Sequence, residues 1–443
     1  MTDPRRALAL ACGLLSAADS SLRAEPLGRT LTLEEAVATA RSRQPQLREA
    51  HAVAEGAHAQ SDVARAALLP QVGGAAGYER TTANYVPRPG SLPGGIGSSA
   101  GASSSWSTLP FYSLGLSATQ LLWDFGASSS AWRASRAAAA SQADNERATA
   151  LQVTTVVRTA FFQARAAREL VRVASETLAD QDRHLAQVVG FVEVGTQPEI
   201  ALATARASQA NARYQLVLAR NGYETAKATL NQAMGVEGPT DYDVSDETVP
   251  PVPGEGADTE ALLAEALSAR PEMAAMEKAV RAQELTVRAG KAEYWPSISA
   301  STGITDAGSQ VASLGWNWSA SLNVTVPVFT GGRTGAQVRV AQWSLESLRA
   351  QADTLRQQVR LDVEQARLGV TSAKAALDSA KDALANAQQQ LRLAEGRYET
   401  GVGTVIELTD AQVALTSAGQ QQVQAEYNLA SARTQLLRAL GRS

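Results

Sequence analysis

The chain has few of the residues that most disulfide and metal sites require. Its 443 residues include one cysteine and three histidines. Cys12 has no partner for an internal disulfide, and His51, His58 and His184 lack the CxxC and HxxxH spacings of zinc sites. The sequence therefore predicts neither a disulfide scaffold nor a metal site, and we expect no cofactor.

Positive charge is not in excess either. Lys+Arg 40 against Asp+Glu 44 gives a formal net charge of −4, which argues against nucleic acid as a partner. The one Gly-Lys pair, Gly290-Lys291, is followed by Ala292 and so makes no phosphate-binding loop. No arrangement of nucleophile, base and orienting group is recognisable. We therefore predict that the protein is not an enzyme.

Long apolar runs are also missing. Beyond the first 20 residues, no apolar run approaches the ~18 residues that a membrane-spanning helix needs. Near the amino terminus two arginines precede the short apolar stretch 7–18, a pattern typical of a secretory signal peptide. We assign this peptide to residues 1–24, with cleavage after Ala18 or Ala24. A less well supported alternative is lipid attachment at Cys12. If the mature chain crosses a bilayer, it does so as strands.

The sequence contains an internal duplication. Prolines in the first part of each copy recur 226 positions apart, Pro45 with Pro271 and Pro70 with Pro296. Later landmarks recur 206 positions apart: Gly195 with Gly401, Leu202 with Leu408, and Met234-Gly235 with Leu440-Gly441. The offset falls because the first copy carries a Gly/Ser/Pro-rich loop, Asn84–Ser105, that the second mostly lacks. We therefore divide the chain into a first repeat at 31–235, a linker at 236–260 and a second repeat at 261–443.

Each repeat contains a pair of segments with the period of a strand. Residues 316–326 alternate apolar and polar without a break, residues 297–304 and 112–119 do the same, and residues 72–78 are the weakest member. Strands about ten residues long match the length that a tilted strand needs to cross a bilayer. Six aromatic residues are candidates for the membrane interface: Trp106, Trp123, Trp295, Trp316, Trp318 and Phe329. The alternative is a soluble sandwich with tryptophan in its core.

Helices are expected on both sides of each strand pair. We predict helices over 33–69 and 262–295, and proline-free helices over 127–190 and 334–397, each of the latter on the order of 95 Å long. Residues at seven-residue spacing mark a coiled-coil seam in the second repeat, with alanine at one core position: Val363, Val370, Leu377, Leu384 and Leu391 with Ala366, Ala373, Ala380, Ala387 and Ala394, and Leu408 with Ala411 and its successors. The first repeat shows the same seam. An ordinary filament or spectrin-like coiled coil is the alternative.

The helical hairpins turn at residues 194–198 and 400–404. Glycine suits the left-handed cap that ends a helix, and Thr404 can cap the start of the next helix. We expect five residues to be exposed at these tips and to be available for contact with a partner: Gly195, Thr196, Gly401, Gly403 and Thr404. Four strands in one chain cannot close a barrel, for which eight is the usual minimum, so the chain must oligomerise. Three copies would supply twelve strands and a long helical wall.

With these features the sequence resembles the TolC family of outer-membrane efflux and secretion channels. The resemblance runs from Leu31 to Gly441 and rests on the duplication together with four motifs: the opening LTLEEA at 31–36, the Leu69-Pro70 and Trp295-Pro296 entries to strands, the VPVFTGG exit at 326–332, and RYETG at 397–401. It implies a mainly α protomer with a transmembrane β-barrel, built as a homotrimer with twelve strands continued by an α-helical periplasmic tunnel. It also implies outer-membrane lipid, a periplasmic adaptor and an inner-membrane pump of RND or ABC type as partners.

The family resemblance further implies a gate at the periplasmic end, held by a tyrosine, an arginine and acidic residues near the second tip. Tyr398, Glu407 and Asp410 occupy the matching positions, and Glu199 lies near the first tip. The arginine position holds Gly403, for which Arg397 at the same tip is a candidate substitute. Glu407 and Asp410, three residues apart on one helical face, could form stacked acidic rings in a trimer and favour cations. Alternatively they complement the helix dipole.

The sequence therefore predicts an outer-membrane channel of a Gram-negative bacterium with a large periplasmic portion, serving an efflux pump or a type I secretion system. Two rival interpretations belong to other classes. A periplasmic adaptor protein also carries a long coiled-coil hairpin, but it has one hairpin where this chain has two. A soluble coiled-coil scaffold explains neither the signal peptide nor the two-faced strands. The cargo stays open between drugs, metal ions and secreted proteins.

Overall fold

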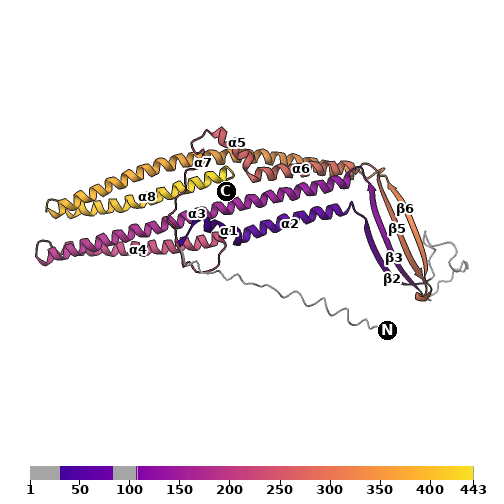
Figure 1. Ribbon diagram of the computed structural model, residues 1–443, viewed down its shortest axis with the longest axis horizontal. Coiled ribbons are helices and arrows are strands. Elements are labelled where there is room, and N and C mark those ends of the chain that lie inside the picture. The colour runs from indigo at the N-terminus through magenta and orange to yellow at the C-terminus, as the bar shows by residue number, and fades with distance from the viewer. Residues whose placement is uncertain (1–29, 83–105, 107, 443) are drawn as a thin grey trace. The chain divides into compact units, whose positions relative to one another are not determined.

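The computed structural model describes residues 30–82, 106 and 108–442 (Figure 1). The predicted signal peptide with Cys12 and the loop 84–105 lie outside these residues. The chain forms two compact units. The first contains the described residues up to Leu47, Ala150–Leu262 and those from Asp362 onward, and the second contains Arg48–Thr149 and Leu263–Leu361. Each repeat of the sequence thus contributes to both units.

The second unit contains one antiparallel sheet of four strands in the order β2-β3-β5-β6. The strands are β2 (Gln71–Thr82), β3 (Thr108–Trp123), β5 (Ser297–Gly308) and β6 (Gly315–Thr325), with a short 3-10 helix, η2 (Val311–Ser313), between the last two. Each repeat supplies one strand pair, as predicted. Among the described residues, β2 and β6 are each paired on one side only, which leaves two open edges.

The register of the sheet brings like side chains together. Leu116 of β3 lies opposite Ile304 of β5, which lies opposite Trp318 of β6. One position along, Ser117 pairs with Gly303, and Gly303 with Ser319. Because successive side chains of a strand point to opposite faces, one face of the sheet is mainly apolar and the other is mainly Ser, Thr, Asn and Gly. The predicted two-faced strands are confirmed.

A side-chain cap marks the start of the long helix that follows β3. The side chain of Asp124, just after β3, accepts hydrogen bonds from the backbone N–H groups of Gly126 (3.1 Å) and Ser128 (2.7 Å), and α3 (Ala127–Glu193) starts there. Further along α3, the buried carboxylate of Asp144 pairs with Lys278 on α6 (Pro271–Ala292). A buried carboxylate needs such a partner, so this ion pair fixes α6 against α3.

The predicted single helices over 33–69 and 262–295 are each divided in two, which corrects that expectation. The first becomes α1 (Leu33–Arg43) and α2 (Pro45–Ala66), and the second becomes α5 (Thr259–Ala269) and α6. The reason is steric, because a residue that precedes proline is pushed out of the helical region. Gln44 and Arg270, which precede Pro45 and Pro271, have extended ψ angles of 119° and 123°.

The first unit has its core where α1, α3 and α4 (Glu199–Met234) meet the linker. Phe161 and Phe162 are fully buried there, with ring centroids 5.5 Å apart in an edge-to-face arrangement. The linker enters this core through Tyr242 and Val244. A short parallel pair, β1 (Thr30–Leu31) with β4 (Asp243–Val244), ties it to the start of the chain.

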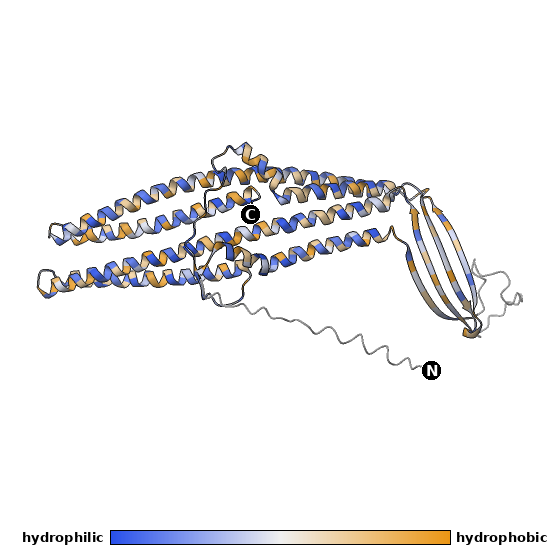
Figure 2. Ribbon diagram, viewed as in Figure 1, coloured by the Kyte–Doolittle hydropathy of each residue, from blue (hydrophilic) through white to orange (hydrophobic). Residues whose placement is uncertain are grey.

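The seam of small residues is confirmed in the helices of the first unit. α3 and α7 (Arg333–Glu399) have the same length, 67 residues, and α7 packs with α8 (Val405–Ala439). Hydrophobic and hydrophilic residues alternate along these helices in Figure 2. Predicted seam positions are buried in both repeats: Val363, Ala366, Val370, Ala373, Leu408, Ala411, Leu436, Ala205, Ala212 and Leu230. Within the described part of the chain, no helix combines the length and apolar character needed to cross a membrane.

Candidate functional site at the hairpin tips

The first tip joins α3 to α4 in a tight turn. Gly195 has φ +76°, a left-handed conformation that glycine adopts without steric cost. The backbone N–H of Thr196 donates to the carbonyl of Phe191 at 2.9 Å, and the Thr196 hydroxyl donates to the same carbonyl at 2.8 Å. These bonds satisfy an acceptor that the end of α3 would leave open. Pro198 takes the position just before α4 begins at Glu199.

The second tip repeats this geometry between α7 and α8. Gly401 also has φ +76°, and the N–H groups of Val402 and Gly403 both donate to the carbonyl of Arg397, at 3.0 and 2.8 Å. Thr404 caps α8, since its side chain accepts from the backbone N–H of Glu407 at 3.2 Å. The predicted cap is confirmed.

The turn at the second tip leaves little room for a side chain at position 403, which is glycine. A Cβ atom at Gly403 would lie 3.0 Å from the carbonyl carbon and Cβ of Arg397 and from the backbone nitrogen of Tyr398. Such contacts are too short for any side chain unless the turn shifts. An arginine at position 403 would therefore require the backbone of this turn to move by a few tenths of an ångström.

Arg397 instead pairs within its own chain. Its Nε lies 3.4 Å from a carboxylate oxygen of Glu407, and both side chains are about half exposed. An ion pair this exposed contributes on the order of 1 kcal/mol or less. Glu407 is thus partly neutralised by its own protomer, whereas Asp410 near the start of α8 and Glu199 at the start of α4 are exposed.

Tyr398 joins the two hairpins. Its hydroxyl accepts a hydrogen bond of 2.7 Å from the side-chain amide of Gln197 at the first tip. Its ring contacts His184 and Phe191 of α3 edge-on, with centroids 5.9 and 6.4 Å away. The predicted gate residue is therefore held by the first hairpin of the same protomer.

His184 is the most deeply buried titratable group beside Tyr398. It is 6% exposed, and its Nδ1 has no hydrogen-bond partner among the described residues. Burial lowers the pKa of His184, because the charged imidazolium is poorly solvated there. The ring is therefore neutral at pH 7.

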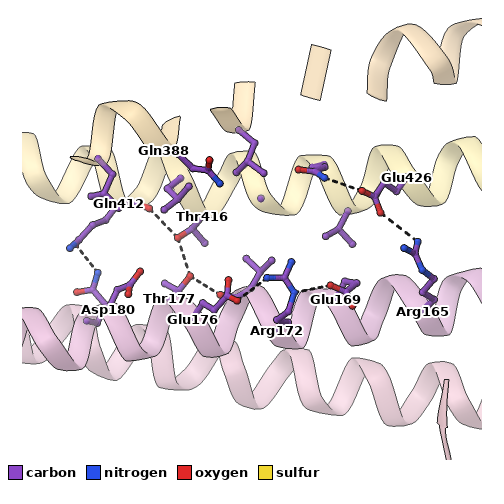
Figure 3. A pocket seen from close by; sticks show the side chains of 18 of the residues that line it. Arg165, Glu169, Arg172, Glu176, Thr177, Asp180, Gln388, Gln412, Thr416 and Glu426 are labelled. Carbon is purple, nitrogen blue, oxygen red and sulfur yellow. Dashed lines mark hydrogen bonds and ion pairs between the residues drawn. The ribbon is translucent and has the colours of Figure 1, made fainter. Parts of the chain in front are cut away.

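Above the tips, a polar cavity of about 360 Å³ opens between α3, α7 and α8 (Figure 3). Three side-chain contacts cross it from α3 to α8: Gln181 to Gln412 at 2.8 Å, Thr177 to Thr416 at 3.1 Å and Arg165 to Glu426 at 3.5 Å. Along α3, Arg172 lies between Glu169 and Glu176 and pairs with both at 2.8 Å. Most of the charges that line this cavity are therefore paired along α3, and Arg165 with Glu426 forms the ion pair that joins α3 to α8.

The candidate interface aromatics form two groups at opposite ends of the sheet. Trp123 and Trp295 lie at the end where the helices begin, and Phe125 contacts both, with centroids 6.0 and 5.3 Å away. Trp316 and Trp318 lie toward the other end, where β6 begins. All six candidates are more than half exposed, from 57% for Trp123 to 95% for Trp106.

Sequence reasoning missed Gln197, His184 and Gln181. For Gln181 a signal existed, since it stands 206 positions before the seam alanine Ala387 and so interrupts the alanine pattern of the first repeat. Gln197 stands likewise 206 positions before Gly403, a place where the two tips differ. A residue that breaks an otherwise regular repeat is a candidate for a special contact. His184 carried no such signal.

Comparison with known proteins agrees with this architecture. The family model described as outer membrane efflux protein matches residues 36–236 and 262–442. A probable efflux pump outer membrane protein, SepC of Pseudomonas putida, is 25% identical over 429 residues, covering 96% of this chain and 86% of its own. Among solved structures, CusC superposes with a TM-score of 0.78 at 23% identity, covering 93% of this chain and 92% of its own.

The outer-membrane channel CmeC of Campylobacter jejuni also has this fold, with a TM-score of 0.79 at 18% identity over 92% of this chain and 85% of its own. The duplicated sheet and hairpins therefore form the protomer fold of an outer-membrane channel. The chain belongs to the outer membrane efflux protein family.

Proposed function

We propose that this outer-membrane efflux protein is the passive exit duct of a tripartite export machine. Three copies would join their sheets into a barrel of about twelve strands and their hairpins into a tunnel, through which solutes delivered from the periplasmic side leave the cell. The protein itself supplies no chemistry, and the energy for export comes from an inner-membrane pump.

The observation that carries this proposal is the sheet with two open edges. β2 and β6 each lack a partner on one side among the described residues, although every strand is long enough to cross a bilayer. Open edges are not tolerated in lipid, because unpaired backbone groups cannot be hydrated there. Neighbouring copies would supply the missing strands, β6 of one copy pairing with β2 of the next.

The two groups of aromatic residues support the same orientation. Trp123 pairs with Ile298 and Trp316 with Asp306, so the rows are eight residues apart along β5. At about 3.4 Å per residue this separation is roughly 27 Å, close to the height of the apolar band of a membrane barrel. We assign Trp123, Trp295 and Phe329 to the periplasmic interface, and Trp106, Trp316 and Trp318 to the outer one.

We infer that a periplasmic adaptor protein docks at the hairpin tips, through Gly195, Thr196, Gly401, Gly403 and Thr404. Similar proteins are named as components of pumps, among them the toluene efflux pump outer membrane protein TtgF of Pseudomonas putida and the cation efflux system protein CusC of Escherichia coli. The inner-membrane partner would be a pump of RND or ABC type. Gly195, Thr196, Gly401 and Thr404 are exposed at the two turns, and this surface is what an adaptor hairpin would contact.

We further propose that Tyr398, Glu407, Asp410 and Glu199 form the gate. The contacts of Tyr398 with Gln197 and His184 would hold α7 against α3 in the closed state. Asp410, exposed near the second tip, would contribute most of the acidic ring, because Glu407 is shared with Arg397. The domain limits inferred above, with repeats at 31–235 and 261–443, belong to the same proposal.

The channel proposal is tested by measuring oligomeric state, ion conductance and cross-linking between copies. Detergent-extracted protein should migrate as a trimer and conduct ions after insertion into a planar bilayer. Cysteines placed at Val72 on β2 and at Leu322 on β6 should cross-link neighbouring copies. Two cysteines placed on the same edge strand should not. A monomer that dissolves without detergent and gives no conductance would overturn the channel proposal.

A further inference from the structure

A second cavity of the first unit differs in character from the polar one of Figure 3. It has a volume of about 830 Å³ and lies between α3, α4 and α8. No Asp, Glu, Lys, Arg or His occurs among the described residues that line it, although 19% of the chain is charged. We call it the neutral hollow. Its volume lies within the range of pockets that enclose drug-sized ligands.

The lining of the neutral hollow is amphipathic rather than oily. Leu170 and Leu218 provide apolar surface, and Leu218 is 45% exposed although it lies in a concave site. Amide and hydroxyl groups surround this surface: Gln163, Gln215, Gln420, Gln421, Gln424 and Tyr427. Such a lining can pack against a ring or an aliphatic chain and still donate and accept hydrogen bonds.

The contacts of the linker with α4 show on which face of this helix the hollow lies. Lys227 of α4 lies beneath the linker, donating to the carbonyl of Thr240 at 3.0 Å while its own carbonyl accepts from Tyr242 at 3.1 Å. Thr225 and Thr229, which line the hollow, are each two residues away and so about 200° around the helix. The hollow is therefore on the face of α4 opposite to the linker.

We propose that the neutral hollow is a contact site for uncharged, amphipathic small solutes on the inner wall of the tunnel. This inference rests on the proposed channel function. A ring of helices has one inner and one outer face; the linker would lie on the outer face, so the hollow, on the opposite side of α4, would face the tunnel. A charged solute would leave water without gaining an ion partner from the lining, which is costly. A neutral solute of similar shape loses no such hydration and gains apolar contact and amide hydrogen bonds. Binding should be insensitive to salt and to pH between about 5 and 8, since the described lining residues include no Asp, Glu, Lys, Arg or His.

Three photoreactive probes with one benzophenone ring system test this assignment. Benzophenone itself is neutral, 4-benzoylbenzoate is anionic and (4-benzoylbenzyl)trimethylammonium is cationic. Purified trimer in lipid nanodiscs would be irradiated with each probe, and the labelled peptides identified by mass spectrometry. We expect peptides covering 215–229 and 417–427 to be labelled by the neutral probe and at least about tenfold less by either charged one.

Two variants and a control make the test specific. At Gly222 an added Cβ meets nothing within 4 Å, so Gly222→Phe should fill the hollow without disturbing the helix and should lower neutral labelling about tenfold. Gly56→Phe, on α2 and with equally open surroundings, should leave labelling unchanged. Leu218→Glu should shift the preference toward the cationic probe, because a carboxylate then faces the ligand.

The outcomes separate the inference from the channel function. A wild-type protein that conducts but is labelled equally by all three probes, or whose labelling persists in Gly222→Phe, would overturn the neutral hollow alone. Absence of labelling in a conducting trimer would do the same, because a neighbouring copy then covers the site. Loss of conductance in the wild type would overturn the proposed channel, and with it the tunnel-wall position of the hollow.

Discussion

The side-chain amide of Gln197 donates a hydrogen bond of 2.7 Å to the hydroxyl of Tyr398. This bond connects the tip of the first hairpin to the last turn of α7 in the second. Gln197 lies 206 positions before Gly403, so the two duplicated tips have different residues at the same place. The first tip carries the long side chain that reaches across, and the second carries the glycine that allows a tight turn.

Removing this bond should loosen the tips. We expect Gln197→Ala and Tyr398→Phe each to cost about 0.5–1.5 kcal/mol of local stability, and the double variant to cost little more, because both lose the same hydrogen bond. Amide hydrogen exchange across 194–199 and 398–404 measures the effect. Tyr214→Phe, at a tyrosine 59% exposed on α4, is the matched control and should be silent. Fully additive effects of the two variants would contradict the coupling.

His184 should make the tip region sensitive to acid. Because burial lowers its pKa in the folded state, the unfolded state binds a proton first as pH falls below about 6.5. Stability is therefore complete above that pH and is lost progressively below it. The protection factors of the amides in α3 around residue 184, which correct for the intrinsic pH dependence of exchange, should fall between pH 7 and pH 5.

A variant without the titrating group separates His184 from other histidines. His184→Leu should remove the pH dependence of the protection factors near residue 184, whereas His51→Gln should preserve it. His51 is exposed and pairs with Glu146 at 3.1 Å, so its loss changes an interaction in the other compact unit. An unchanged pH profile in His184→Leu would assign the acid response to another group.

Glu255 clamps the linker to the helices of the second hairpin. It pairs with Lys374 of α7 and with Arg433 of α8 at 3.2 Å, and it accepts from the backbone N–H of Val252 at 3.1 Å. Burial alone would raise the pKa of Glu255, but the two cations and the N–H outweigh burial, so its pKa lies below the ordinary value. The stabilisation is therefore present above about pH 4.5 and lost as pH falls toward the folded pKa.

Glu255→Gln keeps the shape of this side chain and removes its charge. We expect it to lower the free energy of unfolding by about 1–3 kcal/mol at pH 7, since it breaks charge-assisted hydrogen bonds to Lys374 and Arg433. Chemical denaturation of the detergent-solubilised protein measures the loss. The difference between wild type and variant should shrink toward pH 3. Glu34→Gln, at an exposed position of α1, serves as the control.

The two candidate gate acids should contribute unequally to ion selectivity. Glu407 is 3.4 Å from the cationic side chain of Arg397, whereas Asp410 is exposed. Asp410→Asn should therefore reduce cation preference more than Glu407→Gln. Glu407 and Arg397 together are close to neutral, and an Arg397 released by the second change is half exposed and so screened by solvent ions. Reversal potentials in a salt gradient across a planar bilayer report the difference. Equal or absent effects would argue that these acids only complement the helix dipole.

Much of the architecture could be read from periodicity because repeats and heptads are local properties. The alternation around Trp318 and the seven-residue spacing of Val363, Val370 and their neighbours predicted strands and coiled-coil helices that the structure confirms. The breaks at Gln44 and Arg270 were equally local in origin, since each precedes a proline, but the long helical patterns concealed them. Local steric rules would have corrected that prediction without a structure.

The contacts that define the tips depended on the fold. Gln197 and Tyr398 are far apart in sequence, and their meeting requires two hairpins to be packed side by side. The chain alone therefore determined the duplication, the two-faced strands and the alanine seams, because each is written in residue spacing. Only the tertiary structure decided that Tyr398 bonds to the first hairpin of its own protomer and that an uncharged cavity lies beside α4, since these depend on distances between distant segments. The three-dimensional path of the turn likewise decided that a side chain at Gly403 would be crowded.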